Sequence, residues 1–352
     1  MYLDTQLGEF DLSRVGAEAQ RLERMGFDTL WSFETSHDPY LALGLAAVAT
    51  QRIRLGTNIA VAFARTPMST AMSAWDVARA SQGRFILGLG TQVKPHIERR
   101  FSAVWGQPAA RVKECIQCIR AIWDCWQTGS KPNFEGQFYQ FKLMTPFFNP
   151  GPIAHPEIPI YLAGVNPTMA RAAGEVADGF HVHPLHSVRY LKEVLQPALD
   201  AGARTRGKTV ADLALCVPSF VITGDTPAER SGRERLVREQ IAFYASTPNY
   251  RAVLELHGWV AIGEALSQKV RAGDFAGLGA TVTDAMLDAF AISAPPEHVP
   301  RILRTRYEGL ARHVSLYFPL ASSDPEAKWQ QFVQAFRAAA KGNFESRVSG
   351  FW

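Results

Sequence analysis

The feature that most constrains this chain is an alternation of strand-like and helix-like segments that continues along almost its whole length. The strand-like runs are short, rich in β-branched and aromatic residues and nearly free of charge, and a segment with helical character follows each of them. They cover residues 2–5, 29–33, 53–63, 85–89, 158–163, 179–183, 213–223 and 313–318. Strands joined through helices must run parallel, because a crossover returns the chain to the same end of the sheet.

This regular alternation predicts an α/β protein with a closed (β/α)₈ barrel, the TIM-barrel fold. A doubly wound open sheet is the alternative. The connections are short except in two places, a proline- and aromatic-rich excursion over residues 129–156 and a mostly helical insertion over about 227–295, before the last strand. No change of composition divides the chain, so we expect a single domain over residues 1–352.

The net charge of the chain is small, at +4 over 352 residues. No lysine and arginine run and no motif of basic and aromatic residues accompanies this charge, which argues against a nucleic-acid partner, whereas a small anionic ligand such as a phosphorylated cofactor suits it. The first residues show no basic segment followed by an apolar core, and the longest apolar stretches are too short to span a bilayer. We therefore expect a cytoplasmic protein without a membrane partner.

The cysteines are Cys115, Cys118, Cys125 and Cys216. The Cys115-x-x-Cys118 pair could be a redox or zinc motif, but it lies inside the helical run 111–126, whereas a redox pair usually opens a helix after a strand. We interpret the cysteines as core residues. No metal site is expected either, because no carboxylate pattern accompanies His181 and His183.

Two polar residues follow the second strand-like run, at the end where a barrel binds its ligand. Glu34 and His37 lie three residues apart, and a carboxylate and an imidazole at this spacing could share proton transfer as catalytic residues. The same segment could instead begin a helix, because Ser36 or Asp38 before Pro39 is an ordinary N-cap signal. Both interpretations stay open, and Glu34 is the stronger candidate because it is nearer to the strand end.

The turn after the strand at 158–163 is a candidate anion site. Residues 164–169 (GVNPTM) join this strand to a helix, where free backbone N–H groups and the Thr168 hydroxyl could bind a phosphate, although an ordinary strand–helix turn has a similar composition. One strand earlier, Gly88 and Gly90 indicate that the backbone closely approaches a cofactor ring or a neighbouring strand. His96 follows in a loop with three further basic residues, Lys94, Arg99 and Arg100. We interpret the two arginines as surface charge.

Several short strings, each weak alone, occur in an order that resembles the bacterial luciferase-like superfamily from about residue 1 to residue 320. They are LGTNI at 55–59, RTP at 65–67, SQGRFILGLG at 81–90, Arg111-x-x-Glu114, IYLAG at 160–164 and AGEVADG at 173–179. Members of this superfamily have the barrel predicted above, and they use either FMN with oxygen or the deazaflavin coenzyme F420.

Within the superfamily the chain most resembles the F420-dependent oxidoreductases. The FMN monooxygenases usually carry a His-x-x-x-Tyr motif just before the Arg-x-x-Glu helix, and residues 105–111 (WGQPAAR) contain neither residue of that motif. The resemblance therefore implies hydride transfer between C5 of F420 and a small organic substrate. An FMN-dependent monooxygenase and a non-catalytic flavin-binding barrel remain as alternatives.

The resemblance also implies roles for individual residues. Asn58–Ile59 matches a non-proline cis peptide that forms a bulge behind the central cofactor ring. Glu34 matches an acidic residue that contacts the deazaflavin. Glu34 or His37 would transfer the proton that accompanies the hydride. The residues expected to bind the cofactor are Thr57, Asn58, Ile59, Gly90, Thr91, Gln92, His96, Gly164, Val165, Asn166, Thr168 and Met169. The residues expected to line the substrate pocket are Arg65, His183 and Tyr317.

Departures from a related subgroup at three positions narrow the range of expected substrates. The related sugar-phosphate dehydrogenases have a histidine after the acidic residue, a glutamate after the Gly-Thr-x strand end and a lysine for the substrate phosphate. Here Thr35, Val93 and His186 stand at these positions, so a sugar phosphate is not expected. A homodimer through the outer helices is implied by the resemblance alone.

Overall fold

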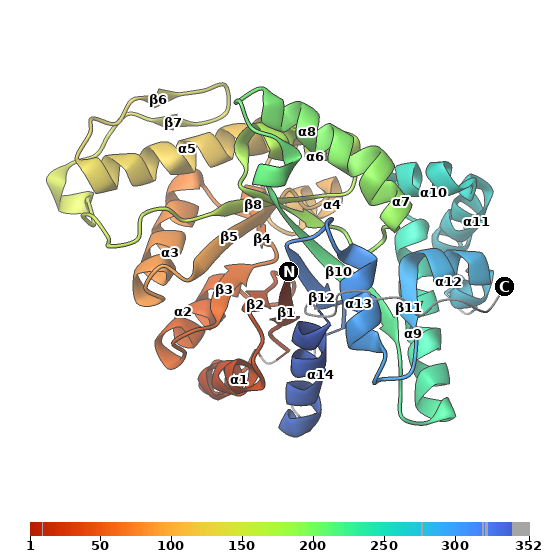
Figure 1. Ribbon diagram of the computed structural model, residues 1–352. Helices are drawn as coiled ribbons and strands as arrows, with labels where there is room; N and C mark the ends of the chain where they lie inside the picture. Colours follow the sequence, from red (N-terminus) through yellow and green to blue (C-terminus); the bar gives the residue numbers. More distant parts are fainter. Residues whose placement is uncertain (9, 276, 319, 321–322, 340–352) are drawn as a thin grey trace.

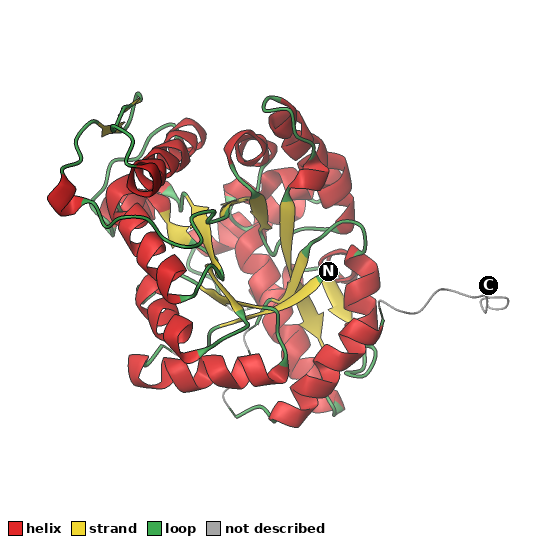
Figure 2. Ribbon diagram, turned by 60° about the vertical axis from the view of Figure 1, so that its left-hand side comes forward, coloured by secondary structure: helices red, strands yellow, loops and turns green. Residues whose placement is uncertain are grey.

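The strands predicted from the sequence pair in parallel and close into a barrel. The computed structural model describes residues 1–8, 10–275, 277–318, 320 and 323–339. Within these residues the sheet runs β11-β10-β12-β1-β2-β3-β5-β8-β9, and an additional pairing of β10 with β9 closes it. Figures 1 and 2 show the strands inside and the helices around them. The predicted (β/α)₈ barrel is confirmed, and the open doubly wound sheet is wrong.

The strands of this sheet are β1 (Tyr2–Gln6), β2 (Thr29–Ser32), β3 (Arg54–Thr57), β4 (Ala60–Val61), β5 (Phe85–Gly90), β8 (Ile160–Gly164), β9 (Gly179–Val182), β10 (Ala214–Ile222), β11 (Ala291–Ser293) and β12 (His313–Leu316). The helices of the first half are α1 (Leu12–Met25), α2 (Pro39–Ala49), α3 (Pro67–Ala80), α4 (Lys94–Arg99), α5 (Pro108–Thr128) and α6 (Pro167–Val176). Those of the second half are α7 (Val188–Tyr190), α8 (Gln196–Arg204), α9 (Pro227–Ala245), α10 (Arg251–His257), α11 (Val260–Arg271), α12 (Asp284–Phe290), α13 (Val299–Tyr307) and α14 (Glu326–Ala338).

Local capping signals explain where several helices begin and end. Asp38 accepts hydrogen bonds from the next two helical amides at 2.8 and 3.1 Å, and Pro39 fills the first position of α2. Gly26 closes α1 in the left-handed region, with a φ of 92°. The N-cap interpretation of the segment after β2 is therefore confirmed for Asp38, and it leaves Glu34 outside the cap.

Two strands differ from the prediction. The single run predicted over 53–63 is divided into β3 and β4, with a cis peptide bond between Asn58 and Ile59, as the resemblance implied. The predicted helical insertion contains α9 to α12 but also ends in β11, which pairs with the far end of β10. Periodicity missed β11 because three apolar residues are too few to distinguish a strand from the end of a helix.

Other segments also have more structure than expected. The excursion at 129–156 contains a short hairpin, β6 (Phe134–Glu135) with β7 (Gln140–Phe141). Glu114 holds its turn, because its carboxylate accepts hydrogen bonds from three successive backbone amides at 2.6 to 2.9 Å. The loop expected around His96 is the short helix α4, and the helix predicted over 188–201 is α7, a π-helical segment (Leu191–Leu195) and α8.

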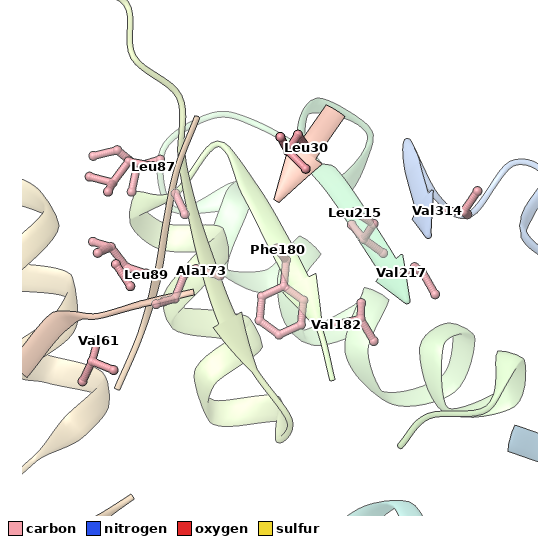
Figure 3. Packing of buried hydrophobic residues seen from close by; sticks show 14 of the residues in the cluster. Leu30, Val61, Leu87, Leu89, Ala173, Phe180, Val182, Leu215, Val217 and Val314 are labelled. Atoms are coloured by element: carbon pink, nitrogen blue, oxygen red, sulfur yellow. The ribbon is translucent and has the colours of Figure 1, made fainter. Parts of the chain in front are cut away.

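Side chains alternate between the two faces of each strand. Phe180 and Val182 of β9 belong to the large core of buried hydrophobic side chains, together with Ala173 of α6 (Figure 3). His181, between them, therefore points to the other face, toward the inside of the barrel. The cysteine interpretation is confirmed as well, because all four cysteines are buried and unbridged, and burial raises the pKa of Cys115 to about 12.

Candidate active site

Aromatic and polar side chains close the interior of the barrel below its mouth. This layer, called the floor here, consists of Asp4, Trp31, Tyr161, His181 and His313, all nearly inaccessible to solvent. Trp31 lies 4.9 Å from His181 and 5.9 Å from His313 between ring centroids. Asp4 accepts hydrogen bonds from the Trp31 indole at 2.9 Å and from His313 at 2.8 Å. A ligand of the barrel must therefore bind above the floor, at the carboxyl ends of the strands.

Interior positions further along five of the strands form the mouth layer, which consists of Asn58, Gly90, Ala163, His183 and Tyr317. Register assigns them to the interior, because a Cβ on Gly56 would lie 2.2 Å from Trp31 and one on Gly88 would lie 2.6 Å from Nε2 of His181. A strand presents the same face every two residues, so the first four follow a floor position or glycine by two residues, and Tyr317 follows His313 by four. The side chains of the mouth layer are thus small on the side of β3, β5 and β8 and aromatic on the side of β9 and β12.

Glu34 is nearly buried and forms a cluster with Arg65. Its carboxylate accepts hydrogen bonds from Nη1 of Arg65 at 2.9 and 2.7 Å and from the Val61 amide at 2.7 Å, and Arg65 also bonds Asp38 at 2.6 Å. Burial alone would lower the pKa of Arg65, but the hydrogen bond and charge of Glu34 outweigh it and raise that pKa. Arg65, expected to line the substrate pocket, is therefore engaged by two carboxylates.

The bulge between β3 and β4 is held by main-chain bonds. The Glu34 amide donates to the Ile59 carbonyl at 3.1 Å, and the Asn58 amide donates to the Ser32 carbonyl at 2.7 Å. A Cβ on Gly90 would lie 2.8 Å from the Ile59 side chain, so the glycine allows Ile59 to pack against β5. The structure therefore brings Asn58, Ile59 and Gly90 together at one edge of the mouth.

The Thr57 side chain lies below the mouth layer, deeper than the side chains that a ligand at the mouth would contact. It is fully buried, its hydroxyl donates to the Gly88 carbonyl at 2.6 Å, and the Gly88 amide donates back to that hydroxyl at 2.8 Å. A Cβ on Gly88 would lie 1.9 Å from the Thr57 carbonyl oxygen. The pair thus joins β3 to β5 just above the floor, and the side chain of Thr57 has its partners within the protein.

The residues after β5 turn the chain across the rim. Thr91 and Gln92 are half-buried, and Gln92 adopts a φ of 59°, a conformation uncommon for residues other than glycine. The Gln92 side chain accepts a hydrogen bond from the Val93 amide at 3.0 Å. His96 lies exposed on α4, and the Arg100 guanidinium bonds the Thr35 carbonyl, which ties α4 to the segment after β2.

The start of α6 has part of the expected anion site. Asn166 uses its side-chain oxygen to cap α6 by accepting from the Met169 amide at 2.9 Å, and the Val165 carbonyl accepts from the Tyr190 hydroxyl at 2.9 Å. Thr168 is exposed at this end, whereas Met169 is buried where a Cβ on Gly164 would strike it at 2.5 Å. Thr168 is thus the accessible polar side chain in the first turn of α6.

On the opposite side of the mouth, His183 pairs with a tyrosine from the insertion. The Leu185 amide donates to Nδ1 of His183 at 3.1 Å, so the ring proton belongs on Nε2, which lies 3.1 Å from the Tyr250 hydroxyl. The two rings stack at 4.4 Å. Burial, with a smaller effect of His186, lowers the pKa of His183 to about 3, which keeps it neutral.

A second tyrosine from the insertion meets Tyr317. The hydroxyls of Tyr244 and Tyr317 lie 2.6 Å apart, and the Tyr244 ring lies 4.4 Å from that of His183. We call His183, Tyr244, Tyr250 and Tyr317 the tyrosine cluster. Tyr244 and Tyr250 were not predicted as site residues, because they lie in α9 and in the short turn before α10, far from any strand end. The aromatic content of FYASTPNY at 243–250 was the available signal.

Two histidines named from the sequence lie outside the mouth layer. His37 is exposed and stacks on Phe10 at 5.1 Å, so it does not reach the Glu34 carboxylate through any described hydrogen bond. His186 is buried between the His183 carbonyl and the Tyr307 hydroxyl, at 2.9 and 3.1 Å. It supports the turn after β9 from within.

Other features of the described chain lie away from the mouth. An apolar cavity of about 320 Å³ lies outside the barrel, between α3, α5 and the excursion. Across the described ranges, His, Cys, Asp and Glu side chains are nowhere grouped in threes or more as a metal site requires. No helix within those ranges is long and apolar enough to cross a bilayer.

Comparisons with known proteins agree with this geometry. An uncharacterised protein of Mycobacterium tuberculosis is 46% identical over 313 residues, which cover 89% of this chain and 92% of that protein. The 5,10-methylenetetrahydromethanopterin reductase of Archaeoglobus fulgidus is 30% identical over 285 residues, covering 79% of this chain and 81% of that protein. The structure of the coenzyme F420-dependent tetrahydromethanopterin reductase from Methanopyrus kandleri superposes with a TM-score of 0.76 at 20% identity, covering 96% and 98%.

The family described as luciferase-like monooxygenase matches residues 2–313, which is most of the chain. The structural likeness confirms the TIM-barrel fold, and the resemblance inferred from the ordered strings is confirmed at the level of the superfamily. The chain therefore belongs to the luciferase-like monooxygenase family, whose members are flavin- or deazaflavin-dependent oxidoreductases.

Proposed function

We propose that this protein is an F420-dependent oxidoreductase that moves a hydride between C5 of the deazaflavin and a small organic substrate. The observation that carries the proposal is the asymmetry of the mouth layer. On one side the Asn58 and Ala163 side chains are small and Ile59 packs on Gly90, while the other side bears hydroxyl and imidazole groups. A flat ring system and a separate polar substrate need these two environments next to each other.

The side chains at the mouth suit the proposed cofactor. The half-buried Asn58 amide makes none of the described side-chain hydrogen bonds and can serve a polar ring edge, while Ile59 offers an apolar surface. Thr91 and Gln92 border this slot, and the exposed Thr168 hydroxyl at the start of α6 suits a phosphate. These residues would hold the deazaflavin, which supplies the hydride at C5 when bound.

The chain itself supplies position and charge. Both oxygens of the Glu34 carboxylate bond Arg65, so we propose that Glu34 orients the bulge and the cofactor edge rather than exchanging a proton. The floor excludes water from below the slot, because its aromatic side chains pack on one another. Proton transfer then falls to groups on the opposite side of the mouth.

The F420 branch is favoured over FMN by two observations. The relative from Archaeoglobus fulgidus and the Methanopyrus kandleri structure are tetrahydromethanopterin reductases, and the latter is described as F420-dependent. In addition, Trp105 packs edge-on against Phe63 at 6.0 Å in the segment where FMN monooxygenases usually carry their histidine and tyrosine. The family description as monooxygenase keeps FMN with oxygen as the second candidate.

The cofactor is tested by titrating the protein with F420 and, separately, with FMN, and following the ring fluorescence. We expect micromolar binding of F420, weakened at least about tenfold by Ala163→Phe, because the larger side chain fills the slot. Ala289→Phe, at a half-buried alanine of α12 outside the mouth, is the matched control. Micromolar binding of FMN with none of F420, together with substrate-dependent oxygen uptake with reduced FMN, would establish the second candidate instead.

We also propose that the chain forms a homodimer. Leu41, Leu45 and Val48 form an exposed apolar stripe along the outer face of α2, with 60%, 38% and 75% of their surface accessible. Helix spacing places these three residues on one face, where a second copy could cover them. Light scattering that gives the mass of one chain would refute this proposal.

A further inference from the structure

The tyrosine cluster has donor groups that its own hydrogen bonds do not use. Nε2–H of His183 donates to Tyr250, so the Tyr250 hydroxyl acts as an acceptor in that bond and its own proton is left. In the Tyr244–Tyr317 pair one hydroxyl donates to the other, and the proton of the accepting hydroxyl is left as well. The described hydrogen bonds of the cluster therefore leave two O–H donors at the mouth.

The surroundings restrict what these donors can bind. Burial raises the pKa of Tyr250 to about 12 and that of Tyr244 further, so both hydroxyls keep their protons at neutral pH. None of the described ion pairs or hydrogen bonds brings a lysine or arginine to these four side chains, so a charged carboxylate or phosphate would find no counter-charge here. The half-buried Tyr317 ring is held against the fully buried Phe220 at 4.6 Å and forms an apolar wall beside the hydroxyls.

We propose that Tyr250 donates a proton to the oxygen of the substrate, and that the substrates are ketones or aldehydes and the corresponding alcohols. A carbonyl oxygen accepts two hydrogen bonds, which matches two neutral donors beside an apolar wall. This inference rests on the proposed F420-dependent function and adds a substrate class to it. Tyr250 would be the catalytic acid, and His183 a positioning residue that holds its hydroxyl.

The reduction consumes one hydride and one proton. The carbonyl carbon receives a hydride, with its electron pair, from the reduced deazaflavin, and the C=O π bond opens onto oxygen. The oxygen takes the proton of Tyr250 to give the alcohol. Nε2–H of His183 stabilises the resulting tyrosinate until water returns a proton, and oxidation of an alcohol follows the same steps in reverse.

The experiment uses the full chain, first titrated with F420, and three probes: cyclohexanone, acetophenone and benzaldehyde. Infrared spectra of carbon-13-carbonyl cyclohexanone on the complex with oxidised F420 should show the C=O stretch at lower wavenumber than in water-free solvent. Tyr250→Phe should reduce this shift to that of a single hydrogen bond and lower kcat about a hundredfold, with a smaller change in KM, because proton donation is lost while the cavity remains. Tyr139→Phe, whose hydroxyl accepts a hydrogen bond from Arg111 and makes no described contact with the tyrosine cluster, is the matched control.

The outcomes separate the two proposals. A chain that binds no F420 refutes the proposed function and this inference with it. A chain that binds F420 but reduces none of the three probes, or whose Tyr250→Phe variant keeps both the infrared shift and kcat, refutes the inference alone. A smaller shift in Tyr250→Phe with unchanged F420 affinity supports it, because a tyrosine that only anchors the insertion would not touch the carbonyl. His183→Gln should reduce kcat less than Tyr250→Phe while F420 still binds.

Discussion

The two sides of the barrel mouth are built in different ways. Over β2 to β8, main-chain bonds and one ion-pair cluster fix the rim, as in the bonds of Glu34 to Arg65 and to the Val61 amide. Over β9 to β12, neutral rings meet, and two of the four come from the insertion, as in the contact of His183 with Tyr250. The first side is suited to holding one cofactor unchanged, whereas the second can change its chemistry by changing a few side chains.

The difference also shows in sequence separation. Glu34 and Arg65 are 31 residues apart and belong to neighbouring strand–helix units. Tyr244 and Tyr317 are 73 residues apart and meet only when the insertion packs over the mouth. We therefore expect damage to the first side to affect the whole fold, and damage to the second to affect mainly the substrate.

The largest effect should follow Arg65→Ala. The substitution leaves the nearly buried Glu34 carboxylate with a single amide donor, so we expect the free energy of unfolding to fall by about 3 kcal/mol. Urea denaturation measures this. Arg24→Ala breaks a solvent-exposed pair with Glu326, and it should change the same quantity by less than about 1 kcal/mol. Equal losses in the two variants would show that the cluster is no stronger than a surface ion pair.

An intermediate effect should follow acidification, because the aromatic side of the mouth contains His183. The pKa of His183 is about 3 in the fold, below its ordinary value of 6.5, so the unfolded chain takes up the proton first as pH falls. The contribution of His183 to the free energy of unfolding is therefore fully present above about pH 6.5. It is lost as the pH falls toward 3, by at most about 1.4 kcal/mol per pH unit. Denaturation of the wild type and His183→Gln at pH 7, 6 and 5 should show a shallower dependence for the variant. Parallel curves would mean that His183 is not held neutral.

The smallest effect should follow Tyr244→Phe. The substitution removes one hydroxyl of the pair with Tyr317 and keeps the ring contacts, so we expect a loss of about 1 kcal/mol in unfolding free energy. F420 affinity should not change, because Tyr244 lies on the side away from Asn58 and Gly90. Calorimetry and cofactor titration measure the two quantities. A tenfold loss of F420 affinity would contradict the division of the mouth into two sides.

Much of the fold could be predicted because its signals are local. Alternating strand and helix patterns indicated the barrel, and Asp38 before Pro39 indicated the start of α2. The cis peptide at Asn58–Ile59 was expected only through the resemblance, since no residue type in that string requires it. The strand β11 and the helix α4 were missed because each is too short to show a period.

The candidate site was predictable in position but not in its bonds. Strand ends such as Glu34 and His183 could be named because parallel strands in a barrel present their carboxyl ends at one rim. The sequence could not indicate that Arg65 pairs with Glu34, or that His37 turns outward against Phe10. Nor could it place Tyr250 beside His183, because the two residues are 67 positions apart and no local pattern fixes how the insertion packs over the mouth.

By itself, then, the sequence determined the order of strands and helices and the rim on which the chemistry lies, since periodicity and capping act over a few neighbouring residues. Only the tertiary structure decided which rim side chains are neutralised and which keep a free donor. A hydrogen bond between distant residues forms only after the barrel closes and the insertion docks, and burial then sets the protonation state of His183 and Tyr250.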